Sequence, residues 1–138
     1  MMPIAMLLTF LTSTIALRMG FEQPPPQWLI LSLAHPETTL AAKAIAAIGA
    51  VIAAPLAEEI LTRWALAGWL AKKMPTAFAA LITAAFFALL HLSIIGSLGL
   101  FALGLLFAAL YFRSGSLLTP IAAHAAFNLA NLASMLLE

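Results

Sequence analysis

Five long apolar runs, separated by short polar breaks, constrain this fold more than any other feature of the sequence. They cover about residues 3–20, 40–73, 76–93, 98–112 and 117–137 and are rich in the helix formers Ala and Leu. Only 8% of the residues are charged, whereas soluble domains have about 25%. About 20 apolar residues in a helix cross a bilayer. The sequence therefore predicts an all-α, polytopic transmembrane helical bundle of about five spans.

The first 39 residues differ in character from the rest of the chain. No Lys or Arg precedes the run at 3–20 and no small-x-small site follows it closely, so we interpret it as a span and not as a cleaved signal peptide. Pro24-Pro25-Pro26 is incompatible with a helix interior, and Trp28 favours a short interfacial segment over 27–34. We expect an N-terminal span with a proline-rich interfacial segment over 1–39, and a helical core over 40–138.

Charge and cysteine content narrow the function further. The net charge of +1 gives no electrostatic footprint for nucleic acid, and the absence of Cys excludes thiolate chemistry and cysteine-ligated metals. Lys72, Lys73 and Arg113 fall on one side of the predicted bundle, opposite Arg18 and Lys43. The small excess of Lys and Arg on the Lys72/Arg113 side favours that side as cytoplasmic, and the N-terminus is then expected inside.

Charged residues inside the second run are the first candidates for function. A charge in hydrocarbon costs about 2.5 kcal/mol or more, so such residues are rare and usually functional. Glu59 and Arg63 are i,i+4 neighbours and are expected to pair on one helix face. Glu58 points about 100° away from Glu59 and has no basic residue at i±3 or i±4. Its partner must come from another helix.

The later runs supply such partners at a matching depth. At 1.5 Å per residue, Glu58 lies about 21 Å from the Lys72 end of its helix and His91 about 22 Å along the next one. Asn128 lies about 17 Å into the last run from the same side, with His124 one turn shallower. These four residues are predicted to line one cavity near the middle of the bilayer.

Each candidate also has a simpler structural interpretation. Polar residues join membrane helices through hydrogen bonds of about 0.6 kcal/mol, and this favours a supporting role for Glu59, Arg63 and Asn131. Phe87 shares a face with His91 but is more often a packing residue, and Gly104 is available for close helix contact. Simple packing does not require two imidazoles and an unpaired carboxylate in one layer, so we assign chemistry to Glu58, His91, His124 and Asn128.

Taken in order, Glu58-Glu59-x-x-x-Arg63, Phe87-x-x-x-His91 and His124-x-x-x-Asn128 resemble the three motifs of the CPBP (ABI) family. These are intramembrane glutamic endopeptidases related to the type II CAAX prenyl proteases. The resemblance covers about residues 50–131 and includes Arg113-Ser114-Gly115-Ser116 ahead of the last motif. Each motif alone is weak, but three in order in successive apolar runs are specific.

The resemblance implies a membrane endopeptidase whose catalytic core is the segment 40–138. Glu58 would be the general base, and His91 would help to bind and activate the attacking water. His124 and Asn128 would stabilise the oxyanion, while Glu59 and Arg63 would support the site. No metal or cofactor is expected. The expected location is the cell membrane, multi-pass, in a prokaryotic inner membrane, with the C-terminal part of a peptide or protein as substrate.

Two alternatives stay open at this stage. Glu58, His91 and His124 form a chemically sensible zinc ligand set, although no His-Glu-x-x-His helix accompanies them. A non-catalytic membrane protein that binds peptides, such as a bacteriocin-immunity factor, is the other alternative, but it would be free to lose one of the four residues. Relatives usually carry more membrane helices before the first motif, so a minimal member, a missing segment or a homo-oligomer that completes the fold all stay open.

Overall fold

The computed structural model describes residues 2–20, 35–93 and 96–136, and this part of the chain contains helices and no strand. The all-α prediction is therefore confirmed for the described residues, whereas the interfacial segment predicted over 27–34 lies outside them. The α-helices and the two π-helical segments, η1 and η2, have these bounds: α1 (Met2–Arg18), α3 (Leu40–Ile48), η1 (Gly49–Ala53), α4 (Ala54–Glu59), η2 (Ile60–Ala67), α5 (Gly68–Leu70), α6 (Thr76–Leu90), α7 (Ser97–Ser114) and α8 (Leu118–Leu136).

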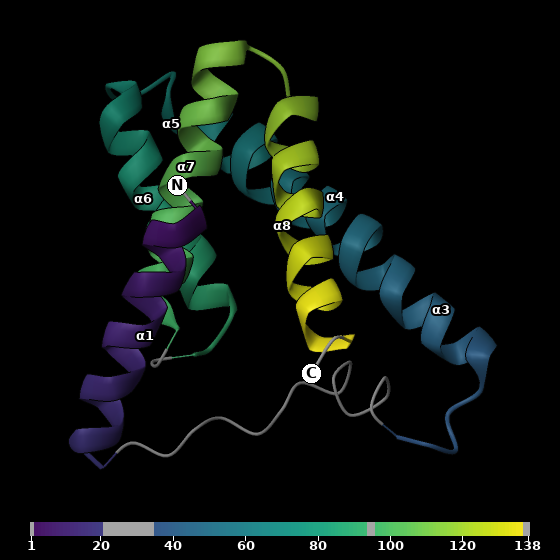
Figure 1. The fold of residues 1–138 in the computed structure, drawn as a ribbon. Helices are drawn as coiled ribbons and strands as arrows, with labels where there is room; N and C mark the ends of the chain where they lie inside the picture. Colours follow the sequence, from purple (N-terminus) through teal and green to yellow (C-terminus); the bar gives the residue numbers. More distant parts are fainter. Residues whose placement is uncertain (1, 21–34, 94–95, 137–138) are drawn as a thin grey trace.

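Helix α7 lies at the centre of the bundle and packs against α1, α6 and α8 (Figure 1). Its approach to α6 is the closest, because a Cβ added to Gly104 would lie 2.9 Å from the Cα of Ala84. The predicted role of Gly104 in close helix contact is thus confirmed. Phe87, Leu103 and Phe107 form the buried core between α6 and α7.

A single helix runs from Leu40 to Leu70 and contains α3, η1, α4, η2 and α5. It begins at Thr39, whose side chain accepts a hydrogen bond from the Ala42 N–H at 3.2 Å, as an N-cap does. Pro55 stands in the first turn of α4, and the π-helical segments lie on both sides of that short helix. Pro55 has no N–H to donate within the helix, and the helix widens locally into π-helical turns around it, a feature common at functional sites.

The predicted ends of the later helices are nearly correct, with one exception. Pro75 precedes α6, and Gly115 ends α7 with a left-handed φ of +65°. The run predicted to extend to residue 93 ends instead at Leu90, because Leu92 takes a φ of +49° and turns the chain out of the helix. His91 is therefore the C-cap of α6 and does not lie within the helix.

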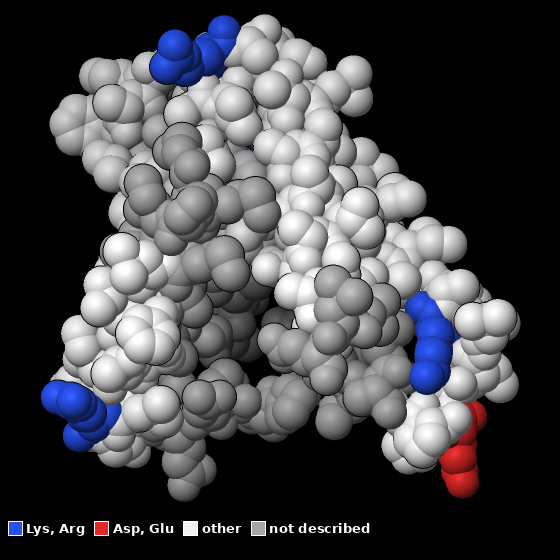
Figure 2. All heavy atoms as spheres, in the orientation of Figure 1, with Lys and Arg blue, Asp and Glu red and all other residues white. Residues whose placement is uncertain are grey.

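Apolar side chains cover the outside of the bundle. Leu40, Ile45 and Trp64 are 83, 72 and 64% exposed, and only 11% of the most apolar window of Leu40–Leu70 is buried. A core helix of a soluble protein would be mostly buried, so this surface is suited to lipid. In Figure 2 the charged side chains visible on this face lie at its upper and lower ends, with an uncharged band between them.

The number of spans stays a prediction. Among the described residues, Leu40–Leu70 and Ser97–Ser114 are long and apolar enough to cross a bilayer, whereas Thr76–Leu90 is apolar but shorter. At 1.5 Å per residue, α6 is about 22 Å long, less than the roughly 30 Å of a hydrocarbon core. A helix of this length that starts at one surface ends inside the membrane.

Candidate active site

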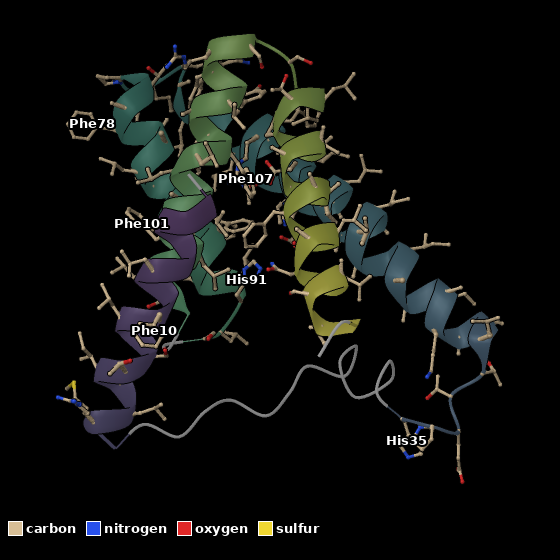
Figure 3. All side chains as sticks on the ribbon, viewed as in Figure 1. Phe10, His35, Phe78, His91, Phe101 and Phe107 are labelled. Atoms are coloured by element: carbon tan, nitrogen blue, oxygen red, sulfur yellow. The ribbon has the colours of Figure 1, made fainter. Side chains whose placement is uncertain are left out.

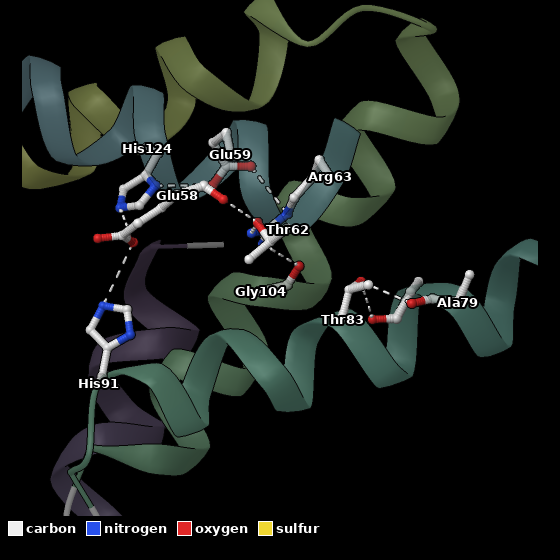
Figure 4. A network of polar contacts seen from close by, with 10 residues as sticks. Glu58, Glu59, Thr62, Arg63, Ala79, Thr83, His91, Gly104 and His124 are labelled. Atoms are coloured by element: carbon white, nitrogen blue, oxygen red, sulfur yellow. Dashed lines mark hydrogen bonds and ion pairs between the residues drawn. The ribbon is translucent and has the colours of Figure 1, made fainter. Parts of the chain in front are cut away.

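Three helices bring a carboxylate and two imidazoles to one point (Figure 4). Glu58 lies on α4, His91 at the end of α6 and His124 on α8. Glu58 Oε2 lies 3.9 Å from the Nε2 atoms of both histidines. The structure thus brings together three of the four residues to which the sequence assigned chemistry. Oε2 is itself buried and makes no hydrogen bond to any described residue.

The end of α6 fixes the orientation of His91. The His91 backbone N–H bonds to the Ala88 and Leu89 carbonyls, so the Phe87 carbonyl lacks its usual helical donor. His91 Nδ1 lies 2.9 Å from this carbonyl oxygen, which can only accept. Nδ1 therefore carries a proton, and Nε2 is the ring atom turned toward Glu58. In Figure 3 the His91 ring lies in the space between α6 and α8.

The neighbouring carboxylate, Glu59, is fully buried and joins two functional groups. Its Oε1 lies 3.0 Å from His124 Nδ1, and its Oε2 lies 3.1 Å from Arg63 Nε. The i,i+4 pair of Glu59 and Arg63 predicted from the sequence is present. An ionised carboxylate can only accept, so Nδ1 of His124 is the donor and Nε2 is the atom turned toward Glu58.

Arg63 is enclosed on all sides although it carries a full charge. Its guanidinium donates to the backbone oxygen of Gly104 at 3.0 Å and to Thr62 Oγ1. It also lies 4.8 and 5.5 Å from the ring centroids of Phe87 and Phe107. Cation–π contacts of this kind add about 2 kcal/mol or more when water is excluded. The buried charge is therefore compensated from α4, η2, α6 and α7 together.

Asn128 reaches a different part of the long helix. Its Nδ2 donates to the Ala50 carbonyl at 2.9 Å. In η1 the Ala54 N–H bonds to Gly49, so the same i+5 pattern would pair Ala50 with Pro55, which has no N–H. Pro55 thus leaves a carbonyl unpaired, and Asn128 satisfies it. This contact holds α8 against the helix that carries Glu58, and it uses one of the two amide protons of Asn128.

The other residues that the sequence predicted, Phe87 and Asn131, have smaller roles in the site. Phe87 is buried and its ring lies 4.8 Å from that of His91, which agrees with packing beside the site. The backbone oxygen of Asn131 accepts a hydrogen bond from the Ser134 hydroxyl at 2.8 Å. No group of three or more His, Asp or Glu side chains in this part of the chain is arranged to hold a metal ion.

Thr62 and Phe107 were not identified from the sequence as part of the site, and Gly104 was identified only for close helix contact. A signal for the last two was present, because Gly104, Phe107 and Tyr111 recur at i, i+3 and i+7 on α7 and mark one face of that helix. That signal shows a shared face but not that the face meets Arg63 and His124. Thr62 gave no signal in the sequence, because Ser and Thr are common in membrane helices without functional contacts.

The assembled site combines one free carboxylate oxygen with two oriented imidazoles. Side-chain exposure is 30% for Glu58 and 24% for His91 but 5% for His124. The site is therefore open on the Glu58–His91 side and closed behind His124. Such an arrangement can take a proton from water on its open side and donate hydrogen bonds from its closed side.

Comparison with known proteins identifies the family of this chain. The family model described as "Type II CAAX prenyl endopeptidase Rce1-like" matches residues 40–130, which include every residue of the site. No curated protein and no solved structure matched the chain. The matched region covers well over half of the sequence, and the fold around it has the apolar exterior of a membrane protein. The chain belongs to the Rce1-like family of type II CAAX prenyl endopeptidases, which are membrane proteases.

Proposed function

We propose that this protein hydrolyses a peptide bond within the membrane, with Glu58 as the general base. The observation that carries the proposal is the position of Glu58 Oε2, buried, without a hydrogen bond to described residues and 3.9 Å from both Nε2 atoms. An ion-pair or packing role would leave this oxygen in direct contact with a donor. A separation of 3.9 Å is too long for a hydrogen bond and calls for a bridging molecule.

The bridging molecule is the attacking water. A water beside the line between Glu58 Oε2 and His91 Nε2 can lie about 2.8 Å from both atoms and form a hydrogen bond with each. With His91 neutral, its Nε2 accepts a hydrogen bond from one O–H of the water, and the Glu58 carboxylate accepts a hydrogen bond from the other O–H. Both acceptors leave the oxygen lone pair free to attack the substrate carbonyl, and transfer of one proton to Glu58 accompanies the attack.

The closed side of the site stabilises the tetrahedral intermediate. With Nδ1 bonded to Glu59, a doubly protonated His124 presents Nε2–H to the oxyanion. Asn128 supplies the amide proton that its bond to Ala50 leaves free. Each fixed donor contributes about 3–4 kcal/mol to transition-state stabilisation when water is excluded. Collapse breaks the C–N bond, and Glu58 returns its proton to the leaving amine.

The substrate class follows from the family and from the location of the site. The family's description is "CAAX prenyl endopeptidase", and in a C-terminal Cys-a-a-X sequence the isoprenoid is carried by the Cys, ahead of the last three residues. The apolar exterior of the bundle allows a lipid-linked peptide to approach from the bilayer, on the half-exposed side of Glu58 and His91. We therefore propose a C-terminal peptide as substrate, with cleavage close to a lipid-modified or apolar residue.

A direct test uses the purified full chain in liposomes. The probes are a farnesylated peptide that ends in Cys-a-a-X and its unprenylated counterpart, and mass spectrometry detects the released C-terminal fragment. The proposal predicts release by the wild type and none by Glu58→Gln. Tight binding of either peptide without cleavage would favour the alternative, a non-catalytic peptide-binding protein. Equal rates for wild type and Glu58→Gln would remove Glu58 as the base.

A further inference from the structure

The orientation of the His124 ring depends on more than its hydrogen bond. The bond from Nδ1 to Glu59 fixes one ring atom, but the plane of the imidazole can still swing about that contact. Nε2 lies on the far side of the ring from the backbone and 3.9 Å from Glu58. A swing of the plane would therefore move Nε2 away from the reacting atoms. Some other group must set the plane of this ring.

Phe107 is the group that can do this. Its ring centroid lies 4.8 Å from that of His124, with an angle of 20° between the planes, so the two rings are stacked. The Phe107 side chain is almost fully buried, and Phe87 meets it edge-on at 6.0 Å. Phe87 also meets the His124 ring nearly edge-on, at 5.6 Å and 73°. One phenyl ring thus covers the imidazole face while the other limits its tilt.

We propose that Phe107 on α7 is a positioning residue that holds the His124 ring in the plane required for Nε2 to face the reaction site. The same phenyl ring lies 5.5 Å from the guanidinium of Arg63, whose ion pair with Glu59 orients the other end of the imidazole. Phe107 therefore stacks on His124 directly and also lies against Arg63, the partner of the Glu59 carboxylate that binds His124. The placement of the ring rests on geometry alone, and only its effect on rate rests on the proposed function.

Ordinary core packing is the competing explanation, and two substitutions separate it from positioning. Phe107→Leu keeps an apolar side chain but removes the stacked ring. Phe107→Tyr keeps the ring but adds a hydroxyl in a buried place, where an unpaired polar group destabilises the fold. If only packing matters, activity follows stability, and the Tyr variant is the more damaged. If positioning matters, the Tyr variant keeps the ring and the rate despite lower stability.

The His124 ring can be observed directly, without any substrate. The chain has three histidines, His35, His91 and His124, so histidine labelled with ¹³C and ¹⁵N gives three ring signals in detergent micelles. Replacing His35 and His91 by Gln, one at a time, assigns them. The stacked phenyl ring shields the His124 ring protons, and we expect these signals to move downfield in Phe107→Leu but not in Phe107→Tyr. The His35 and His91 signals serve as internal references.

Phe101→Leu is the matched control, because Phe101 lies six residues earlier on α7, roughly 240° around the helix. Figure 3 shows it on the side of α7 away from Phe107. We expect it to leave the His124 signals in place. A second ring-free variant, Phe107→Met, repeats the measurement if Phe107→Leu does not fold. Unchanged His124 signals in a folded ring-free variant would overturn the proposal.

Cleavage of the farnesylated probe gives the second readout. In Phe107→Leu we expect kcat to fall about tenfold or more with KM within twofold, because misplacement of a catalytic group affects the reaction step. Phe107→Tyr should keep kcat within about threefold of the wild type. If the rates of Phe107→Leu, Phe107→Tyr and Phe107→Met simply follow their thermal stability, the positioning role is rejected. If the wild type cleaves no probe, the proposed function fails, while the histidine spectra still decide the role of Phe107.

Discussion

Two neighbouring glutamates, Glu58 and Glu59, occupy opposite kinds of environment. Glu59 is fully buried, and its two oxygens lie 3.0 Å from His124 Nδ1 and 3.1 Å from Arg63 Nε, although only the contact with His124 is a hydrogen bond. The Glu58 side chain is 30% exposed, and its Oε2 approaches two imidazoles only to 3.9 Å. One peptide bond separates a carboxylate with two basic groups at about 3 Å from one whose two imidazole neighbours are 3.9 Å away.

The difference shows how a membrane helix can hold a carboxylate without a hydrogen-bonded partner among apolar side chains. Removing charges from water is costly unless each one has a partner of good geometry. The Glu59–Arg63–His124 network pairs its buried charges at 3.0 and 3.1 Å and joins the helices around the site. We infer that Glu58 can then lack a hydrogen-bonded partner, because this network holds the helices together beside it. The following experiments test this separation between a structural carboxylate and a reactive one.

The largest effect is expected from Glu58→Gln, which keeps the shape of the side chain and removes the base. Cleavage of the farnesylated peptide should fall by about 10³-fold, within the range known for general base catalysis. The thermal midpoint in detergent should stay within about 2 °C, because Oε2 makes no hydrogen bond to described residues. A large loss of thermal stability would show that Glu58 is structural, and the comparison with Glu59 would fail.

Arg63→Met should have the opposite profile and damage the fold itself. It leaves the buried Glu59 carboxylate without its countercharge, which destabilises by about 3–5 kcal/mol. Equilibrium unfolding in mixed micelles measures the loss. Arg18→Met is the matched control, since Arg18 is exposed at the end of α1. The double variant Glu59→Gln/Arg63→Met should regain part of the stability; no recovery would argue against a coupled pair.

Gly104→Ala tests the α7 side of the structural network. An added Cβ would lie 2.9 Å from the Ala84 backbone, and Gly104 is also the residue whose carbonyl accepts from Arg63. We expect a loss of about 1–3 kcal/mol in the same unfolding experiment. Gly49→Ala is the control, because a Cβ there meets nothing within 4 Å and Ala favours the helix. Equal effects of both substitutions would mean that the close approach of α6 and α7 is unimportant.

Leu92→Gly tests the turn that ends α6 beside the reactive group. A left-handed backbone costs a non-glycine residue about 1–2 kcal/mol, and Leu92 has a φ of +49°. Part of this cost is offset by the greater freedom of Gly in the unfolded chain, so stability should rise by about 0.5–1 kcal/mol. Leu90→Gly, within the helix, should instead lower it. A destabilised Leu92→Gly protein would mean that the Leu92 side chain makes a needed contact.

Chelator treatment should have no effect on the rate. If Glu58 acts as a base on water, dialysis against EDTA and then 1,10-phenanthroline leaves cleavage within about twofold of the untreated enzyme. Metal analysis of the same sample provides the control. Stoichiometric zinc, with activity lost on its removal and restored by its return, would make Glu58, His91 and His124 ligands, and neither glutamate would then be a base.

Local features of the fold were predictable because neighbouring residues decide them. Pro75 and Gly115 limit helices through their own backbone preferences, and the pairing of Glu59 with Arg63 follows from their spacing of four residues. The early end of α6 was missed because it rests on Leu92, a residue type with no preference for a left-handed φ. The sequence pattern therefore extended this helix by three residues.

The candidate site was predictable in its residue types and depth but not in its contacts. Equal depth placed Glu58, His91 and His124 in one layer, and the structure brings them together. The sequence did not reveal that His124 donates to Glu59, that Phe107 stacks on His124, or that Asn128 reaches the Ala50 carbonyl. Each of these contacts joins residues that are 17 or more positions apart, so no local preference encodes it.

By itself, the sequence determined a helical membrane protein with Glu58, Glu59 and Arg63 in the interior of its longest apolar run, since apolar length, helix breakers and helical spacing are local properties. Only the tertiary structure decided which groups from other helices meet each acid: His124 bonds to Glu59, and Glu58 faces the imidazoles of His91 and His124. That choice depends on how α6, α7 and α8 rotate about their axes when they pack. The rotation is set by close packing at Gly104 and by the rings of Phe87 and Phe107, contacts that exist only after the helices have met.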